Sequence, residues 1–179
     1  MTRTELAAKI HEVSNLKGSF VLRSGATATE YFDKYLFEAD PVLLREIATH
    51  MLPLLPGDAD ALAGLELGGV PLAVMLSQLS GLPLLSVRKK AKEYGTRRLA
   101  EGGEVAGRRL VVIEDVVTSG GQVVASTEDL RALGAEIDTA LCVIDRQAGG
   151  PAALRGAGVG LRALYTMAEL KEAAAGREP

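Results

Sequence analysis

The residues best suited to chemistry lie in one stretch that leads into a short turn. Glu114 and Asp115 follow four apolar residues, and the turn Thr118-Ser119-Gly120-Gly121 comes shortly after them. Glycines let backbone N–H groups face an anion, hydroxyls donate to it, and a following helix presents its positive end. The turn therefore suits a phosphate. The two carboxylates suit ribose hydroxyls, or a metal ion held by a pyrophosphate.

Competing interpretations of this stretch fit less well. Paired acids after a strand can be solvated loop residues, but a phosphate-sized turn beside them favours a binding site. A P-loop needs G-x-x-x-x-G-K-[ST] and a dinucleotide fold needs G-x-G-x-x-G before its first helix, and neither occurs here. A receiver domain would use acids at strand ends but would leave the turn unexplained.

A cationic segment, Arg88 to Arg98, is the second candidate. It carries six of the 20 basic residues in a chain of net charge −3. A run of charges is usually a solvated surface. This run instead leaves a predicted strand beside two Gly-rich loops, one at Leu67-Gly68-Gly69 and one at the phosphate turn. We therefore interpret it as a loop that binds a polyanion.

The elements that must position these residues form a repeated pattern of strand, loop, helix and strand. Right-handed crossovers would bring both Gly-rich loops to the carboxyl ends of a parallel sheet, where open α/β sheets bind ligands. The sequence thus predicts an α/β fold with a central, mainly parallel sheet flanked by helices. The predicted elements of the pattern are strands 61–65, 84–87, 110–113 and 137–144 and helices 70–80 and 123–133.

The remaining segments complete this fold. We expect a helix over 4–13, a strand or hairpin arm over 18–25, a helix from Asp40-Pro41 to Leu54, a small helix near 151–155, a strand over 160–165 and a helix from Met167. An aromatic cluster spans Glu30 to Phe37. It is either a strand packed on the core or a wall for a flat ligand.

Composition narrows the class of protein. The 179 residues suit one domain that buries about 70% of its unfolded surface. Aromatic residues make up 4% with no Trp, and the net charge is negative, so we expect no nucleic-acid partner. Cys142, the single cysteine, lies in an apolar run and is expected to be a buried thiol. No signal-peptide core or apolar run of membrane-spanning length occurs, so we expect a cytoplasmic protein without a membrane partner.

The stretch from Val111 to Gly121 resembles the phosphoribosyl-pyrophosphate signature of the type I phosphoribosyltransferases. Within that family, Arg88-Lys89-x-x-Lys92 with Gly95 and Asp145-Arg146-Gln147 is similar to the orotate-specific branch. Phe20 to Gly25, ahead of Tyr31-Phe32, resembles the small N-terminal hood of that branch. The resemblance covers roughly residues 16–170. It implies one domain over 1–179, with a hood from about 1–37 plus the C-terminal segment and a core of about 38–160.

The resemblance also implies roles for individual residues. Lys92 and Asp115 would be catalytic, and Mg²⁺ would be bound mainly through the substrate pyrophosphate rather than by protein ligands. Orotate would contact Tyr31, Phe32, Thr118 and Arg146. Phosphoribosyl pyrophosphate would contact Arg23, Gly68, Gly69, Arg88, Lys89, Lys92, Tyr94, Glu114, Asp115, Val116, Val117, Thr118, Ser119, Gly120, Gly121 and Gln122. The family further implies a homodimer in which the Lys92 loop closes over the neighbouring subunit's site, and a non-proline cis peptide in the loop at 67–69.

Three positions depart from the pattern of the orotate branch. Tyr94 stands where the family usually has His, Leu67-Gly68 replaces a common Tyr-Lys pair, and Arg23 replaces a common Lys. Two alternatives therefore stay open. One is a phosphoribosyltransferase for a purine or another carboxylated base. The other is a regulator that senses phosphoribosyl pyrophosphate and binds nucleic acid.

Overall fold

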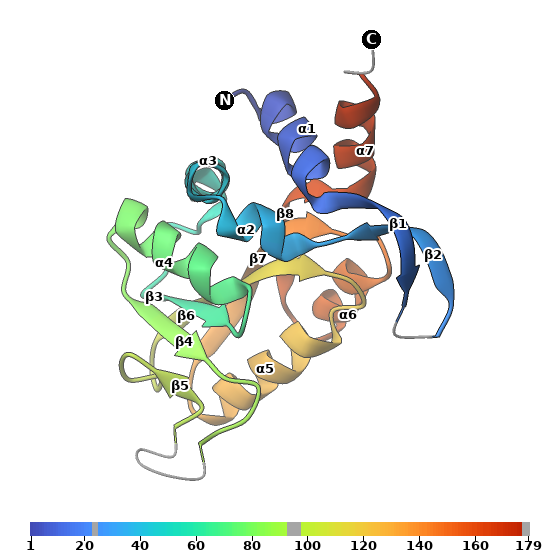
Figure 1. Ribbon diagram of the computed structural model, residues 1–179. Helices are drawn as coiled ribbons and strands as arrows, with labels where there is room; N and C mark the ends of the chain where they lie inside the picture. Colours follow the sequence, from blue (N-terminus) through green and yellow to red (C-terminus); the bar gives the residue numbers. More distant parts are fainter. Residues whose placement is uncertain (23–24, 93–97, 177–179) are drawn as a thin grey trace.

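The computed structural model describes residues 1–22, 25–92 and 98–176. Its centre is a six-stranded sheet in the order β5-β4-β3-β6-β7-β8, and a separate two-stranded hairpin pairs β1 with β2 (Figure 1). Strands β4, β3, β6, β7 and β8 run parallel, whereas β5 pairs antiparallel with β4. The predicted α/β class and mainly parallel sheet are confirmed. The strands are β1 (Asn15–Val21), β2 (Thr27–Phe32), β3 (Ala61–Leu65), β4 (Leu84–Val87), β5 (Ala100–Glu101), β6 (Arg109–Val117), β7 (Glu136–Asp145) and β8 (Gly160–Thr166).

Helices cover both faces of the sheet. One apolar cluster joins one face to α1, α3 and α4, and a second joins the other face to α5 and α6. Cys142 is fully buried in the second cluster, as predicted. The helices are α1 (Arg3–Ser14), α2 (Lys34–Ala39), α3 (Pro41–Met51), the 3₁₀ turn η1 (Leu52–Leu54), α4 (Gly69–Ser80), α5 (Gly121–Ala132), α6 (Gly150–Gly156) and α7 (Met167–Ala175). Within the described residues, no helix is both long and apolar enough to cross a membrane.

Local signals account for several boundaries. The Asp40 carboxylate accepts hydrogen bonds from the N–H groups of Val42 and Leu43, which caps α3 ahead of Pro41. Gly81 ends α4 in the left-handed conformation, at φ 78°. Strand β3 is buried at every residue and has the predicted bounds. These elements hold the Gly-rich loop between β3 and α4 at the carboxyl edge of the sheet.

Three details differ from the sequence prediction. The aromatic segment 30–37 is not one strand, because β2 ends at Phe32 and the Asp33 side chain caps α2 through the N–H of Tyr35. Strand β5 was not predicted, since two residues carry too little pattern. Strand β6 continues through both acids to Val117, so Glu114 and Asp115 lie within the strand.

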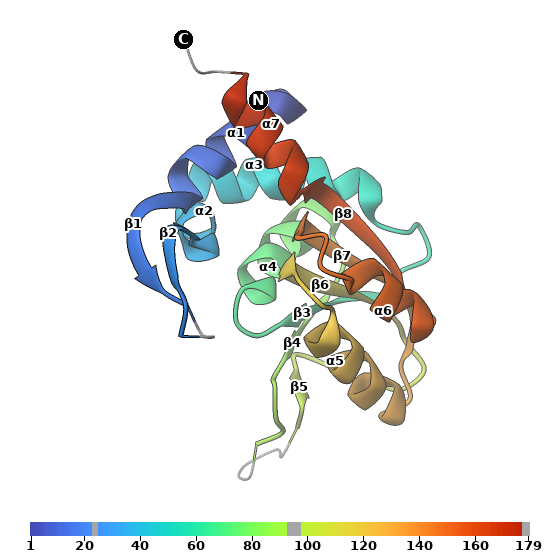
Figure 2. The same cartoon turned by 90° about the vertical axis from the view of Figure 1, so that its right-hand side faces the viewer.

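The two ends of the chain lie together. Helices α1 and α7 pack side by side, and hairpin β1–β2 projects from the body on the side of α2 (Figures 1 and 2). The Tyr165 hydroxyl donates to the Arg3 carbonyl at 2.7 Å, and the Arg3 guanidinium pairs with Glu169 at 2.8 Å. This arrangement agrees with a hood made from both ends of the chain, although its predicted boundaries stay a prediction.

Candidate active site

The two acids at the end of β6 have different surroundings. Successive side chains of a strand point to opposite faces. Asp115 is on the same face of the strand as Ile113, which packs with α3 and α4. Glu114 is on the opposite face with Val112, which packs with α5. Asp115 is fully buried and Glu114 is 8% exposed. The carboxyl end of β6 therefore supplies one acid to each side of the sheet.

A cavity of about 150 Å³ lies where β6 passes into α5. Gly120 in the turn has φ 81°, and a Cβ on it would lie 2.5 Å from a Leu154 methyl carbon, so only glycine fits. Thr118 and Ser119 are exposed at the start of α5. Hydroxyls, turn amides and a helix N-terminus thus converge as a phosphate site requires. The cavity is lined by Glu114, Val116, Val117, Thr118, Ser119, Gly120, Gly121, Gln122 and Val123.

Asp115 lies outside that cavity, among charged partners. Its Oδ2 is 2.5 Å from the Lys34 Nζ, and its Oδ1 accepts from the Val116 N–H at 2.5 Å. Gly68 lies directly beside the same carboxylate. A Cβ added at Gly68 would lie 1.7 Å from Asp115 Oδ2 and 2.7 Å from Glu38 Oε1. Helix α2 and the loop before α4 therefore cover Asp115 together.

Three carboxyl groups share this region with the Lys34 ammonium. Burial, reinforced by the charge of Asp115, raises the pKa of Glu38 to about 8 and that of Glu114 to about 9. Burial alone would raise the pKa of Asp115 as well, but hydrogen bonds with Glu114, Glu38 and Lys34 lower it. Asp115 is consequently the ionised member of the group at neutral pH, paired with Lys34.

The second Gly-rich loop joins the acids to the cationic segment. The Glu66–Leu67 peptide is cis, within the loop where the family resemblance implied such a bond. Glu66 Oε1 accepts a hydrogen bond from the Lys89 N–H at 2.5 Å. A Cβ on Gly69 would lie 2.2 Å from the carbonyl oxygen of Ile113, so this loop lies directly against β6. The predicted loops do meet at one edge of the sheet.

Two cations of segment 88–92 contact β5. Lys92 Nζ lies 2.5 Å from Glu101 Oε1, and Arg88 Nε lies 3.8 Å from the same atom. These contacts lower the pKa of Glu101, chiefly through the hydrogen bond with Lys92. Lys89 is exposed. Tyr94 lies outside the described residues.

The predicted base-binding residues come from two elements. Arg146 directly follows β7, its N–H donates to the Val117 carbonyl at 2.9 Å, and its side chain is exposed. In the hairpin, Tyr31 is 46% exposed and its ring centroid lies 5.6 Å from that of Phe20, while Phe32 packs against the core. The packing of Phe32 agrees with the first interpretation of the aromatic segment, and a wall for a flat ligand stays a prediction. Arg23 lies outside the described residues.

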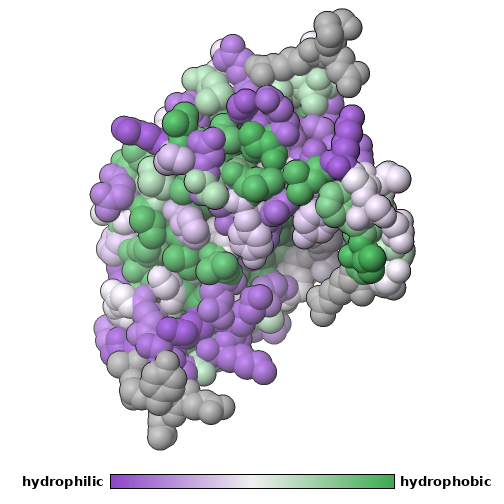
Figure 3. Space-filling view, viewed as in Figure 1, coloured by the Kyte–Doolittle hydropathy of each residue, from purple (hydrophilic) through white to green (hydrophobic). Residues whose placement is uncertain are grey.

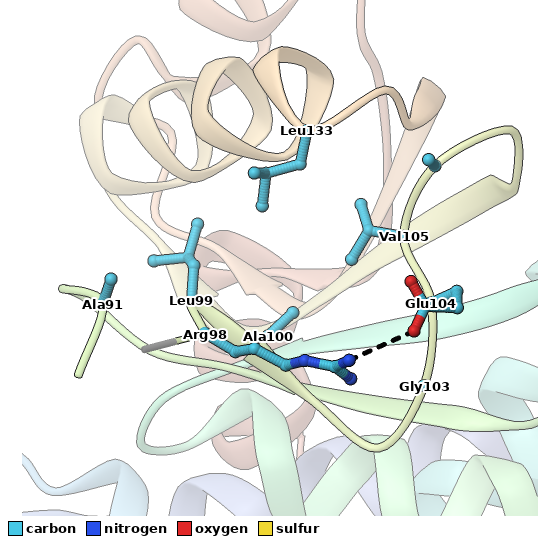
Figure 4. Close-up of a pocket in the computed structure, with 9 residues that line it drawn as sticks. Ala91, Arg98, Leu99, Ala100, Gly103, Glu104, Val105 and Leu133 are labelled. Carbon is cyan, nitrogen blue, oxygen red and sulfur yellow. Dashed lines mark hydrogen bonds and ion pairs between the residues drawn. The ribbon is translucent and has the colours of Figure 1, made fainter. Parts of the chain in front are cut away.

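A larger cavity, of about 300 Å³, lies between segment 98–106 and the end of α5 (Figure 4). Its lining is mainly apolar, with Leu99, Val105 and Leu133 around it, and an Arg98–Glu104 ion pair of 3.2 Å at its edge. It shares no lining residue with the cavity at the phosphate turn. The chemistry of their linings makes the smaller cavity the better candidate for a phosphate site.

Sequence reasoning missed Lys34, Glu38 and Glu101. Lys34 and Glu38 are four residues apart and so share one face of α2. That spacing was available from the sequence, but the segment was expected to be a strand or a ligand wall. Nothing local indicates that Glu101 would meet Lys92, because the contact depends on β5 pairing with β4.

Comparison with known proteins agrees with this geometry. The family model for the phosphoribosyl transferase domain matches residues 42–156. Phosphoribosyltransferase is thus the class that both the fold and the site define. The chain is 58% identical over 168 residues to an orotate phosphoribosyltransferase of Nocardioides sp., covering 94% of each chain, and 40% identical to one of Methanocella arvoryzae, covering 93% of this chain and 96% of that one.

Solved structures give the same result. The orotate phosphoribosyltransferase of Mycobacterium tuberculosis matches with a TM-score of 0.84 and 30% identity, over 94% of this chain and 98% of that one. The enzyme of Aeropyrum pernix matches with a TM-score of 0.80 and 30% identity, over 98% and 99%. The chain belongs to the type I phosphoribosyltransferase family, and within it to the orotate phosphoribosyltransferases.

Proposed function

We propose that this protein transfers ribose 5-phosphate from phosphoribosyl pyrophosphate to orotate, which yields orotidine 5′-phosphate and pyrophosphate in pyrimidine biosynthesis. The observation that carries this proposal is the carboxyl edge of the sheet, where the acid pair and the phosphate-sized turn at the end of β6, the Gly-rich loop after β3 and the cationic segment after β4 lie together. The 5′-phosphate would lie in the turn at 118–121. The ribose hydroxyls would bind Glu114 and Asp115, and the pyrophosphate would lie between Gly68-Gly69 and segment 88–92.

The reaction needs positioning and charge neutralisation more than acid–base chemistry. The bond between C1 of the ribose and the pyrophosphate oxygen breaks, and its electron pair leaves with the pyrophosphate. The ring nitrogen of orotate, which is readily deprotonated and has released its proton to solvent, then donates its lone pair to the oxocarbenium-like C1. Lys92, Arg88 and Lys89 would neutralise the leaving group, and Arg146 would bind the orotate carboxylate through its planar guanidinium. Closure of the substrate site would exclude water, which also reacts with the cation.

Mg²⁺ fits this site as an ion bound mainly by the substrate pyrophosphate. Three carboxylate oxygens near the phosphate turn already have partners: Glu114 Oε1 accepts from the Asp115 N–H at 3.0 Å, Asp115 Oδ2 pairs with Lys34, and Asp115 Oδ1 accepts from the Val116 N–H. Pyrophosphate oxygens are the hard donors that Mg²⁺ prefers. The ion would therefore come to the site on the pyrophosphate and supply further charge neutralisation there.

A homodimer is part of the proposal. Apolar side chains gather over α2, α3 and α4, on the face shown in Figure 3. Single exposed apolar residues are ordinary, but a group of them marks an interface. This surface, named here the α2–α4 surface, consists of Leu36 (38% exposed), Val42 (63%), Leu67 (65%), Val74 (41%) and Leu79 (37%). In the dimer that the family resemblance implies, the Lys92 loop of one subunit would close over the site of the other. A cytoplasmic location stays a prediction.

A panel of bases tests the function. The protein is incubated with phosphoribosyl pyrophosphate, Mg²⁺ and orotate, uracil, hypoxanthine, guanine or adenine, and pyrophosphate release is measured. Release with orotate alone is expected, and release only with a purine would identify the alternative transferase. A mobility-shift assay with nucleic acid, without turnover of any base, would instead identify a regulator.

A further inference from the structure

Helix α2 brings two charged side chains to the acid end of β6. Lys34 and Glu38 lie one turn apart on this helix, and Lys34 Nζ is 2.5 Å from Asp115 Oδ2. Glu38 is 9% exposed, and its Oε1 and Asp115 Oδ2 both lie beside the position that a Cβ on Gly68 would take. The contact thus joins α2, β6 and the loop before α4.

The position of α2 is fixed by its own contacts. Phe37 is fully buried in the core, and the Asp33 side chain caps the helix. The Asp33 N–H donates to the Ser14 carbonyl at 2.8 Å, which ties the start of α2 to the end of α1. Lys34 therefore lies on a helix that is packed against the core, and this helix holds its side chain near Asp115.

Charge balance makes Lys34 necessary for an ionised Asp115. Glu38, Glu114 and Asp115 are all nearly or fully buried, and among the described residues Lys34 is the cation that pairs with this group. A buried carboxylate without a cation takes up a proton, because burial disfavours the charged form. A protonated Asp115 would lose acceptor capacity that a pair of ribose hydroxyls requires.

We propose that Lys34 is a positioning residue for the reaction, whose ion pair keeps the Asp115 carboxylate charged and oriented for the ribose hydroxyls. Together, Lys34 at Oδ2 and the Val116 N–H at Oδ1 set the plane of the carboxylate. Lys34 also follows the predicted base-binding pair Tyr31-Phe32 by two residues. The ion pair thus connects the base side of the site to the ribose side. This inference rests on the proposed function, in which Asp115 binds ribose.

Two substitutions at Lys34 and one elsewhere test the proposal. Lys34→Met keeps the length and removes the charge, Lys34→Arg keeps the charge, and Lys9→Met is the control, because Lys9 pairs with Glu12 within the exposed face of α1. Binding of phosphoribosyl pyrophosphate with Mg²⁺ is measured by calorimetry, KM and kcat by pyrophosphate release with orotate, and folding by thermal unfolding.

The expected result is selective. Lys34→Met should weaken phosphoribosyl-pyrophosphate binding and raise its KM at least tenfold, with the KM for orotate changed less than threefold. Lys34→Arg should restore binding to within about fivefold of the original protein, and Lys9→Met should leave it unchanged. Equal binding by Lys34→Met, or an equal defect in folded Lys34→Arg, would overturn the proposal. So would parallel losses for both substrates with a lowered melting temperature.

The design separates this inference from the proposed function. If the unsubstituted protein binds phosphoribosyl pyrophosphate but releases no pyrophosphate with orotate, the proposed function fails and the binding comparison still decides the role of Lys34. If it turns over orotate and Lys34→Met binds normally, the inference alone fails. If the unsubstituted protein does not bind phosphoribosyl pyrophosphate, both are overturned.

Discussion

The Lys92 ammonium and the Glu101 carboxylate form an ion pair, with Nζ 2.5 Å from Oε1. This contact ties Lys92, which is proposed to neutralise the pyrophosphate leaving group, to β5. Arg88 approaches the same carboxylate. A lysine held by its own chain cannot at the same time neutralise a pyrophosphate. Substrate binding must therefore exchange Glu101 for the leaving group, and the partial exposure of both side chains permits that exchange.

The first prediction concerns Lys92. Lys92→Ala should lower kcat by about 10²-fold, because its charge is needed most when the pyrophosphate leaves. Binding of phosphoribosyl pyrophosphate should change much less. Steady-state kinetics and calorimetry measure the two effects, with Lys9→Ala on α1 as the control. Normal turnover would remove Lys92 from the mechanism.

The second prediction concerns Asp115. Asp115→Asn should abolish measurable binding of phosphoribosyl pyrophosphate, because the neutral amide has one acceptor oxygen and cannot pair with Lys34. Calorimetry with Mg²⁺ present provides the measurement. Asp129→Asn, at an exposed position on α5, is the matched control. Unchanged affinity in Asp115→Asn would contradict the ribose assignment.

The third prediction concerns Gly68, which covers the Asp115 carboxylate. Gly68→Ala should reduce activity strongly and lower the free energy of unfolding by about 1–3 kcal/mol, because its Cβ would lie 1.7 Å from Asp115 Oδ2. Gly57→Ala is the control, since nothing lies within 4 Å of a Cβ there. Urea unfolding and pyrophosphate release measure both variants. Full activity in Gly68→Ala would mean that the loop does not lie against Asp115.

The fourth prediction concerns pH. The folded protein holds a proton on Glu38 up to about pH 8, whereas the unfolded chain releases it near the ordinary pKa of 4.5. The folded state thus binds more protons between these values, and the free energy of unfolding should fall as pH rises through this interval. Glu38→Gln, which cannot ionise, should show a shallower fall. Urea unfolding at pH 5, 6.5 and 8 measures the slopes, and Glu128→Gln should leave the original slope intact.

The fifth prediction concerns the α2–α4 surface. Val74→Glu places a charge in the centre of a proposed apolar interface, where burial of an unpaired carboxylate is costly, so it should shift a dimer toward monomer. Leu133→Glu, at a position 48% exposed against 41% for Val74 but at the end of α5, should leave the dimer intact. Analytical ultracentrifugation measures the assembly. A dimer that persists in Val74→Glu would place the interface elsewhere.

Local sequence signals were sufficient for much of the fold. The Asp40-Pro41 cap, the apolar run 61–65 and the glycine at position 81 each act within a few residues of where they stand, so their structures could be predicted without knowledge of the rest. The phosphate turn was recognisable for the same reason, since its glycines, hydroxyls and following helix are consecutive. These signals, together with the family resemblance, indicated the class of ligand.

The tertiary structure alone decided what surrounds the acids. Lys34 meets Asp115 across 81 positions of sequence, and Lys92 meets Glu101 only because β5 pairs with β4. The full burial of Asp115 likewise depends on α2 and Gly68 packing over β6. Such contacts have no local periodicity, because partners far apart in the chain are brought together by sheet order and helix packing. The sequence by itself therefore indicated the candidate binding residues, and the fold determined which of them are charged, covered and paired.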